Sequence, residues 1–302
     1  MRKKNSTIIL FLLFVAFIFS CSPEQKPRER WTEEQANEWY KPWGWLRGSN
    51  FYPSTAINLE LGWAAGIGMN CMRVYLHHAV WEADREGFKE RMEQYMDIAE
   101  NHGISTIFVF FDDCWNATYA LGKQPDPKPG IHNSGWVHDP GDLLFEKPEL
   151  INTLETYVKD ILTTFRKDKR IVFWDLYNEP GNSGYGNKSM FLLEKVFEWG
   201  RTANPSQPLS VGIWNKELSD LTTYSLEQSD IISYHNYSDV ANHSKAIDSL
   251  KRYNRPMICT EYMARTSNST FETIMPLLKE HHVGAINWGL VSGKTNTIFA
   301  WD

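Results

Sequence analysis

The stretch IVFWDLYNEP, residues 171–180, carries the most information about the fold. An apolar run leads directly into Asn178-Glu179-Pro180, and a glycine-rich loop, residues 181–187, follows. The run does not alternate with polar residues, which is typical of a parallel strand buried on both faces. Such strands bring functional groups together at their C-terminal ends. The stretch therefore predicts a buried strand that places Glu179 at this edge.

A second segment repeats this arrangement. Met257–Thr260 is apolar, and Glu261 follows it directly. Glu261 lies 82 positions after Glu179, which corresponds to about three βα units of roughly 30 residues each. In a ring of eight strands these would be the fourth and seventh strands, and their carboxylates would face each other across the mouth.

Short apolar segments of this kind alternate with longer amphipathic ones. The expected strands are Leu46–Phe51, Cys71–Leu76, Ser105–Phe111, Ile171–Tyr177, Leu209–Ile213, Ile231–Tyr234, Met257–Thr260 and Ala285–Trp288. The expected helices are Phe88–His102, Leu150–Arg166, Ser189–Thr202, Lys216–Gln228, Val240–Tyr253 and Phe271–His281. Alternation of this kind gives a closed barrel or a doubly wound sheet, and eight strands favour a (β/α)8 barrel over residues 43–302.

Two features interrupt the regular alternation. Residues 112–149 are too many for an ordinary βα connection, so this segment is expected to be functional. The sequence also ends soon after the eighth strand, at Asp302. We therefore expect the last barrel helix to be short or missing.

Paired carboxylates across a barrel mouth are what hydrolysis of a glycosidic bond requires. One donates a proton to the leaving oxygen, and the other attacks the sugar or activates water. Either glutamate alone is equally well explained as an ordinary residue at a strand end or a helix N-terminus. The pairing of Glu179 with Glu261 therefore carries the inference.

Asn178-Glu179 after the fourth strand and Glu261 after the seventh resemble the clan A retaining glycoside hydrolases, most closely the family 5 cellulase and mannanase group. The resemblance extends from about Trp43 to Trp301. It implies an O-glycosyl hydrolase that cleaves β-linked glycans by double displacement, without a cofactor. Glu179 would be the acid/base and Glu261 the nucleophile.

Further positions match the same group. His235-Asn236-Tyr237 matches the family's His-x-Tyr, in which the tyrosine bonds the nucleophile. Arg73 matches an arginine that steadies the nucleophile, and Asn178 an asparagine that binds the sugar 2-hydroxyl. Trp288 matches the tryptophan that forms the floor of the sugar subsite.

The end of the third strand departs from the family, which often has a histidine there. This chain has Asp112-Asp113-Cys114-Trp115 instead. Asp113, Trp115 and Trp136 are taken as candidate substrate contacts. For the two tryptophans, packing within the loop and stacking on sugar rings are equally good explanations.

Two alternatives to a retaining enzyme stay open. A non-catalytic carbohydrate-binding lipoprotein would use the same scaffold without the reaction. An inverting glycosidase would hold its carboxyl groups about 6.5–9.5 Å apart, rather than about 5–5.5 Å. The sugar, the linkage, and internal or terminal cleavage are not determined by the sequence.

The N-terminus has the architecture of a targeting segment. Residues 2–4 are basic, Ile8–Phe19 is continuously apolar, and Cys21 follows. Twelve helical residues extend about 18 Å, too short to cross a bilayer core of about 30 Å. Residues 1–20 are therefore predicted to be a lipoprotein signal peptide, with lipidation at Cys21 and a polar tether over Ser22–Arg30 within an N-terminal segment of residues 21–42. The alternative is a simple secretory signal.

The predicted signal peptide and lipidation at Cys21 indicate that the protein lies in the bacterial cell envelope and is attached to the membrane through lipid alone. The net charge of −6 is spread along the chain without a basic stripe, so nucleic acid is not an expected partner. Past Cys21 the sequence has an odd number of cysteines, which does not indicate a disulfide framework. If both lay in a strand, His77 and His78 would point to opposite faces, so they make a poor metal pair and no metal site is expected.

Overall fold

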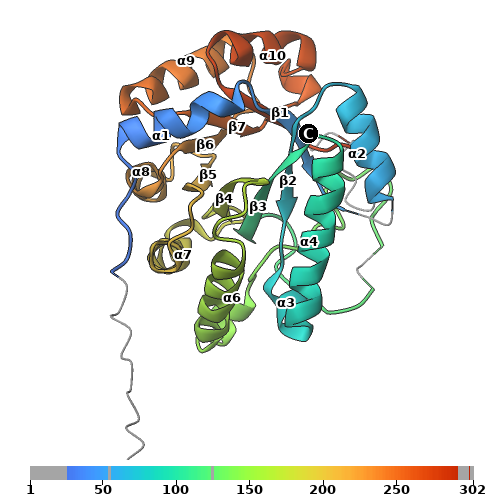
Figure 1. Cartoon of the computed structure of the whole chain (residues 1–302), viewed down its shortest axis with the longest axis vertical. Helices are drawn as coiled ribbons and strands as arrows, with labels where there is room; N and C mark the ends of the chain where they lie inside the picture. Colours follow the sequence, from blue (N-terminus) through green and yellow to red (C-terminus); the bar gives the residue numbers. More distant parts are fainter. Residues whose placement is uncertain (1–25, 54–55, 124–125, 292–298, 300–302) are drawn as a thin grey trace, which may run out of the picture.

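The computed structural model describes residues 26–302 apart from 54–55, 124–125, 292–298 and 300–302. Eight parallel strands form a closed barrel in chain order (Figure 1). The strands are β1 (Arg47–Phe51), β2 (Cys71–Tyr75), β3 (Ser105–Asp112), β4 (Ile171–Asn178), β5 (Leu209–Ile213), β6 (Ile232–His235), β7 (Met257–Glu261) and β8 (Gly284–Asn287). Strand β1 pairs with both β2 and β8, which closes the ring. The expected (β/α)8 barrel is confirmed, and each expected strand boundary lies within one residue of the observed one.

Helices alternate with the strands and surround them. The α-helices are α1 (Glu33–Tyr40), α2 (Ile57–Gly66), α3 (His78–Ala83), α4 (Arg85–Asn101), α5 (Leu143–Glu146), α6 (Leu150–Thr164), α7 (Met190–Ala203), α8 (Ser219–Gln228), α9 (Val240–Leu250) and α10 (Phe271–Glu280). Short 3-10 turns are η1 (Lys41–Trp43), η2 (Gly186–Ser189), η3 (Lys251–Tyr253) and η4 (Arg265–Ser267). The expected helices correspond to α4 and α6 to α10, whereas α1, α2, α3 and α5 were not expected.

The strands separate two layers of apolar packing. Along β4, Phe173 belongs to a buried cluster inside the barrel, while Trp174 and Leu176 belong to the cluster between strands and helices. This division follows from the alternation of side chains along a strand. Ala36 of α1 lies in the inner cluster, so α1 closes the base of the barrel. The inner layer nearer the mouth is polar, and it holds the fully buried Arg73.

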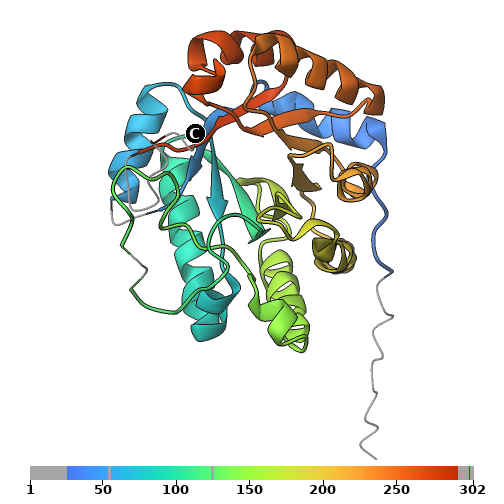
Figure 2. The same ribbon diagram turned by 180° about the vertical axis from the view of Figure 1, so that it is seen from behind.

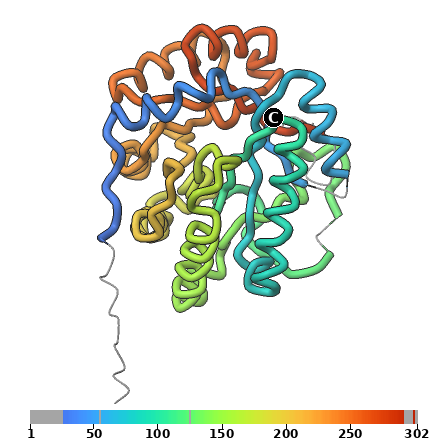
Figure 3. The backbone as a smooth tube through the Cα atoms, viewed as in Figure 1, coloured from blue at the N-terminus to red at the C-terminus, as the bar shows by residue number. Residues whose placement is uncertain are grey.

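The segment before α1 lies beside α8 (Figure 3). Arg28 donates to the buried Asp230 over 2.6 Å, and Arg30 donates to the Ser229 carbonyl over 2.7 Å. The predicted tether over Ser22–Arg30 is therefore wrong for its last residues, because a buried carboxylate binds Arg28. Residues 1–20 and Cys21 lie outside the described residues.

No helix among the described residues is long and apolar enough to span a bilayer. The expectation of a short or missing last helix concerns residues that mostly lie outside the described ranges. Residues 288–291, directly after β8, are not helical.

The long connection between β3 and α5 runs over the side of the barrel near α2 (Figure 2). Asp139 fastens it by accepting bonds from the backbone N–H of His78, over 2.7 Å, and from the ring of His78. His77 and His78 follow β2 and stack on each other, 5.4 Å between ring centroids. The condition under which they would point to opposite faces is not met, because β2 ends at Tyr75 and neither histidine lies in the strand.

Candidate active site

Glu179 and Glu261 lie at the C-terminal ends of β4 and β7. Glu261 is the last residue of its strand, and Glu179 directly follows Asn178, the last residue of β4. The backbone of Glu179 has φ of +46°, a left-handed conformation that is uncommon outside glycine and turns the chain away from the strand. One oxygen of each carboxylate and a ring nitrogen of His235 all lie within 4.8 Å of one another.

Three donors surround Glu261. Arg73 Nη1 donates to its Oε1 over 2.8 Å, and the Tyr75 hydroxyl donates to the same oxygen over 3.1 Å. The Tyr237 hydroxyl donates to Oε2 over 2.6 Å. Arg73 also pairs with the buried Asp175 over 2.9 Å, so its guanidinium is held between two carboxylates. Such pairing offsets part of the cost of burying an arginine.

The pKa of Glu261 reflects opposing influences. Burial raises it, and the nearby Glu179 raises it further, whereas His235, Arg73 and Tyr237 oppose the rise. Arg73 itself stays charged, because its acidic partners outweigh the effect of burial and raise its pKa. A permanent cation in direct contact favours the ionised form of Glu261.

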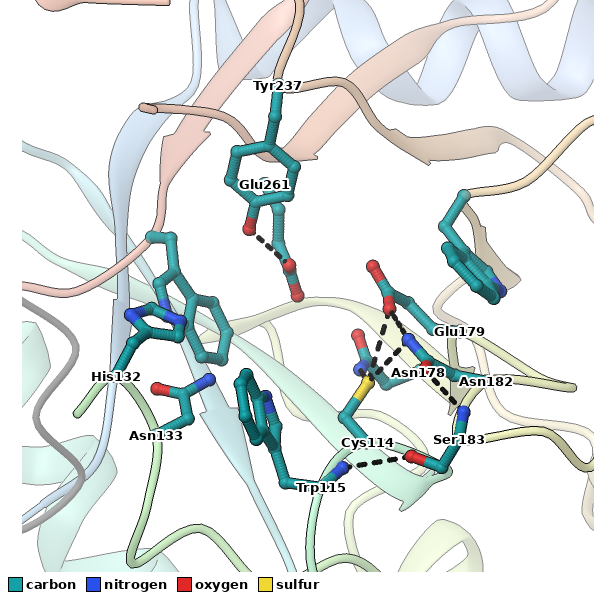
Figure 4. A pocket seen from close by; sticks show the side chains of 12 residues that line it. Cys114, Trp115, His132, Asn133, Asn178, Glu179, Asn182, Ser183, Tyr237 and Glu261 are labelled. Carbon is teal, nitrogen blue, oxygen red and sulfur yellow. Dashed lines mark hydrogen bonds between the residues drawn. The ribbon is translucent and has the colours of Figure 1, made fainter. Parts of the chain in front are cut away.

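Within the described part of the chain, Glu179 is in direct contact with neutral groups alone. His235 Nδ1 lies 2.5 Å from its Oε1. Cys114 Sγ lies 3.2 Å from its Oε2, and Asn182 Nδ2 donates to the same oxygen (Figure 4). Burial raises the pKa of Glu179, and the bonds from Cys114 and Asn182, together with the more distant Arg73, only partly oppose it. Glu179 is thus suited to hold a proton near neutral pH.

His235 lies behind the two carboxylates. Burial lowers its pKa to about 4, so its ring is neutral near pH 7. The ring passes close to Gly212 of β5, where a Cβ atom would lie 2.9 Å from His235 Nε2. Glycine at this position therefore leaves the space that the imidazole occupies.

Asn178 is held by four contacts within the protein. Its Oδ1 accepts from Arg73 Nη2 over 2.6 Å and from the Tyr75 hydroxyl over 3.1 Å. Its Nδ2 donates to Asp112 over 2.7 Å and to Cys114 Sγ over 3.4 Å. A sugar hydroxyl would have to compete with these contacts, the sulfur contact being the weakest.

A cavity of about 540 Å³ lies between the two carboxylates. Its lining residues are Cys114, Trp115, His132, Asn133, Asn178, Glu179, Asn182, Ser183, Trp214, Tyr237, Glu261 and Trp288. Six of the residues predicted from sequence thus meet at one cavity. The other four, Arg73, Asp113, Trp136 and His235, do not line it. Arg73 and His235 contact the carboxylates from behind.

Asp113 lies beneath the loop that follows Glu179. It accepts bonds from the Tyr177 hydroxyl and the Gly181 N–H, both over 2.7 Å, and from the Ser189 hydroxyl over 2.5 Å. Burial raises its pKa to about 7. A substrate contact by Asp113 is not supported, because its carboxylate is fully occupied in holding this loop in place.

Trp136 is buried and packs behind the cavity wall. Its ring lies 4.7 Å from that of Tyr75 and 5.3 Å from that of Trp288, between centroids, and its Nε1 donates to Asp112 over 2.6 Å. Trp115 differs, since it lines the cavity and is 43% exposed. Packing is therefore the better explanation for Trp136, and Trp115 keeps the free face that stacking on a sugar needs.

Several cavity residues were missed from sequence. Cys114 and Asn182 each lie within three positions of a strand end or of Glu179, a signal that a systematic scan of strand ends would have found. Trp214, which donates to the Pro180 carbonyl over 3.2 Å, directly follows β5 and carries the same signal. Asn133 lies deep in the long connection, and no local pattern marks it.

Two groups of described residues have the composition of a metal site. Glu179, His235 and Glu261 form one, and their geometry is already explained by the paired carboxylates. His77, His78 and Asp139 form the other, in which Asp139 serves to anchor the long connection to the start of α3. Neither arrangement requires an ion to account for its contacts.

Solved structures share this fold. They include a family 5 enzyme, GH5_18, from Streptomyces cattleya in complex with GlcNAc (TM-score 0.58, 12% identity, covering 81% of this chain and 70% of that chain). An endo-1,4-β-mannanase from Eisenia fetida matches with a TM-score of 0.56 and 12% identity over 84% of this chain and 90% of its own. An endo-β-1,4-mannanase from Thermotoga petrophila matches with a TM-score of 0.55 and 15% identity over 82% and 68%.

At these identities the likeness shows the fold alone. No curated protein sequence matches the chain. The sequence model of the cellulase family (glycosyl hydrolase family 5), however, matches residues 63–293, well over half of the chain and including both carboxylates. With both glutamates at the barrel mouth, this match identifies the chain as a member of glycosyl hydrolase family 5.

Proposed function

We propose that this glycoside hydrolase cleaves β-linked glycans or oligosaccharides with retention of configuration, through a covalent glycosyl-enzyme on Glu261. The observation that carries the proposal is the pair of carboxylates with oxygens within 4.8 Å and unlike surroundings. Glu261 touches a permanent cation, whereas Glu179 touches only neutral groups. Pairs whose environments differ in this way divide the acid and nucleophile roles between them.

The separation favours retention over inversion. An inverting enzyme needs about 6.5–9.5 Å between its carboxyl groups to admit a water beneath the sugar, whereas a retaining one needs about 5–5.5 Å. One oxygen of Glu179 lies within 4.8 Å of one oxygen of Glu261, which is nearer to the spacing of a retaining enzyme. A binding-only scaffold would gain nothing from two buried carboxylates of which one raises the pKa of the other.

In the first step, an oxygen of Glu261 attacks the anomeric carbon while the bond to the leaving oxygen breaks. Glu179 transfers its proton to that oxygen, so the leaving group departs as a neutral alcohol. The negative charge of Glu261 passes into the new ester bond. Arg73, Tyr75 and Tyr237 hold Glu261 in its ionised form before attack.

In the second step, the ionised Glu179 removes a proton from water as the water oxygen attacks the anomeric carbon. The ester bond breaks, and Glu261 leaves as a carboxylate. Glu179 is then protonated for the next cycle. Two inversions give net retention of configuration.

The cavity wall suits a chain of sugars. Trp115, Trp214 and Trp288 come from three different parts of the barrel and all line the cavity. Flat aromatic faces stack on the apolar faces of sugar rings. Because mannanases are among the structural neighbours, we propose β-mannan and β-glucan oligosaccharides as the first substrates to test.

A panel of polysaccharides and aryl β-glycosides tests the proposed reaction. Purified protein should release reducing sugar from at least one β-linked substrate, and NMR of the first product should show the β-anomer. A product with inverted configuration would overturn the double displacement. Binding without turnover across the panel would favour the carbohydrate-binding alternative.

We further propose that the protein is lipid-anchored at Cys21 in a bacterial cell envelope. The basic residues 2–4, the short apolar run Ile8–Phe19 and the cysteine that follows support this. Cys21→Ala should release the protein from membranes. A variant that stays membrane-bound would contradict lipid anchoring.

A further inference from the structure

Cys114 occupies a defined place in the hydrogen bonding of the site. Its sulfur lies 3.2 Å from Glu179 Oε2, and it accepts from two amides, Asn178 Nδ2 and Asn182 Nδ2, each over 3.4 Å. The thiol has one hydrogen to give. Because both amides donate to the sulfur, that hydrogen is directed to Glu179.

The thiol keeps this hydrogen at working pH. Burial raises the pKa of Cys114 well above its ordinary value, and the carboxylates of Asp112, Glu179 and Glu261 raise it further. Cys114 is therefore a neutral donor rather than a thiolate. It carries no charge that would repel the ionised form of Glu179.

The two oxygens of Glu179 are thus not equivalent. Oε2 accepts from Cys114 and from Asn182, so it has no position left for a proton of its own. Oε1 faces His235 Nδ1 at 2.5 Å. Figure 4 shows the bonded oxygen on the side of Cys114 and Asn182, while the other oxygen is directed toward Glu261 across the cavity.

We propose that Cys114 is a positioning residue that, together with Asn182, fixes Oε2 of Glu179 as the accepting oxygen and confines the transferable proton to Oε1. The proposal rests on the acid/base role of Glu179 given above. In the first step the O–H bond at Oε1 breaks, and its proton passes to the glycosidic oxygen. The electron pair stays on the carboxylate, and the S–H bond at Oε2 stabilises the charge.

His235 is compatible with this assignment. Its ring is neutral, because burial lowers its pKa to about 4, so Nδ1 can accept a hydrogen bond from Oε1–H while Nε2 carries the ring hydrogen. Among the described residues Nε2 has no hydrogen-bond partner, and Nδ1 also lies 3.4 Å from Glu261 Oε2.

Two substitutions at position 114 test the role of the donor. Cys114→Ala removes the S–H bond, whereas Cys114→Ser keeps a donor of similar size. Losing a donor to the charged form raises the pKa of Glu179, so the protonated acid persists to higher pH. The alkaline limb of kcat/KM should therefore move up by about 0.5–1 pH unit in Cys114→Ala and stay near wild type in Cys114→Ser.

Leaving groups give a second readout. In Cys114→Ala the proton is free to reside on Oε2, so substrates with poor leaving groups should lose about 5- to 10-fold in rate, while dinitrophenyl glycosides change little. Cys114→Val, which fills the site without a donor, should behave as Cys114→Ala and excludes rescue by an added water. Cys71→Ala, at the buried start of β2, serves as the control cysteine, with an unchanged pH profile.

Equal pH profiles for the alanine, valine and serine variants would overturn the proposal, as would a downward shift of the alkaline limb in Cys114→Ala. Glu179→Ala, measured in parallel, separates this failure from that of the acid/base role. If Glu179→Ala is sensitive to the leaving group but Cys114→Ala leaves the limb unmoved, only the positioning role fails. If Glu179→Ala is insensitive, the acid/base role itself fails.

Discussion

The two ends of the barrel use buried charge in opposite ways. At the base, Asp230 accepts from Arg28 over 2.6 Å and from Arg201 over 2.8 Å. It also accepts from the backbone N–H groups of Trp31 and Leu209, over 2.9 and 2.8 Å. One carboxylate thus meets two guanidinium groups and two backbone donors. The contacts from Arg28, Trp31 and Arg201 join outer segments to the barrel, and the contact from Leu209 joins the start of β5 to the segment just before β6.

At the mouth, the guanidinium group of Arg73 contacts Glu261 and Asp175 but not Glu179. Glu261 touches Arg73, which is divided between Glu261 and Asp175, and Glu179 has no cation in direct contact. Burial and the repulsion from Glu179 raise the pKa of Glu261. The folded protein is therefore less stable when Glu261 is ionised. The base therefore stabilises the fold, whereas the mouth retains an unfavourable arrangement that its chemistry requires.

The largest effect is expected from Glu261→Ala. Loss of the nucleophile should lower kcat by about 10⁵-fold or more, on the scale of removing a covalent nucleophile. The Tm of the variant should be no lower than that of the wild type, because one of two repelling carboxylates is removed. Azide or formate should restore turnover and give product of inverted configuration. Retention of substantial activity in the variant would remove Glu261 from the mechanism.

Glu179→Ala should have the next largest effect, about 10²- to 10⁴-fold, for substrates with poor leaving groups. Activated aryl glycosides need little protonation and should lose far less in the first step. The measurement is kcat/KM across a series of aryl glycosides of graded leaving-group pKa. Equal losses along the series would contradict the acid assignment.

Asp230→Asn, at the base of the barrel, should lower the stability of the fold without altering catalysis, whereas the two glutamate variants lower activity. It leaves Arg28 and Arg201 without their carboxylate, which costs about 3 kcal/mol or more for a buried pair. Denaturant unfolding should show the loss, while kcat of the folded enzyme stays at the wild-type value. Asp248→Asn, which breaks an exposed pair with Lys251, is the matched control and should leave stability unchanged. A large fall in kcat for Asp230→Asn would contradict the assignment of stability to the base of the barrel and catalysis to its mouth.

Tyr237→Phe should give the smallest effect, confined to the acid limb of the pH profile. The Tyr237 hydroxyl donates to Glu261 over 2.6 Å, so its removal raises the pKa of Glu261. The ionised nucleophile then appears only at higher pH, and the acid limb of kcat/KM should move up by about one pH unit. The limbs belong to a coupled pair, so the comparison is between shifts of the two limbs. A shift confined to the alkaline limb would reverse the assignment of the two glutamates.

The sequence predicted the strands and the paired carboxylates well, because buried parallel strands leave a continuous apolar pattern. The sequence analysis did not predict helix α1, although the sequence contains a signal for its N-terminus. Thr32 and Gln35 form a capping box at the start of this helix, which a search restricted to hydrophobic periodicity overlooks. Arg28 and Arg30 were taken as tether because their partners, the Asp230 carboxylate for Arg28 and the Ser229 carbonyl for Arg30, lie about 200 residues away in sequence.

Within the site, sequence reasoning could find residues at strand ends but not the direction of their side chains. Asp113 directly follows β3, yet its carboxylate points to the loop of Ser189 rather than to the cavity. Trp136 and Asn133 come from the same connection, and only the folded loop determines that Asn133 lines the cavity and Trp136 does not. Contacts made by irregular segments depend on tertiary packing, which leaves no periodic pattern in the sequence.

The most direct test of the central claim is to trap the covalent intermediate. The enzyme is incubated with an activated 2-deoxy-2-fluoro-β-glycoside of the sugar it hydrolyses, and the labelled peptide is identified by mass spectrometry. Double displacement through Glu261 predicts a single glycosyl label on Glu261, formed in the wild type and absent in Glu261→Gln. A label on Glu179, or turnover of the natural substrate to product of inverted configuration, would contradict it.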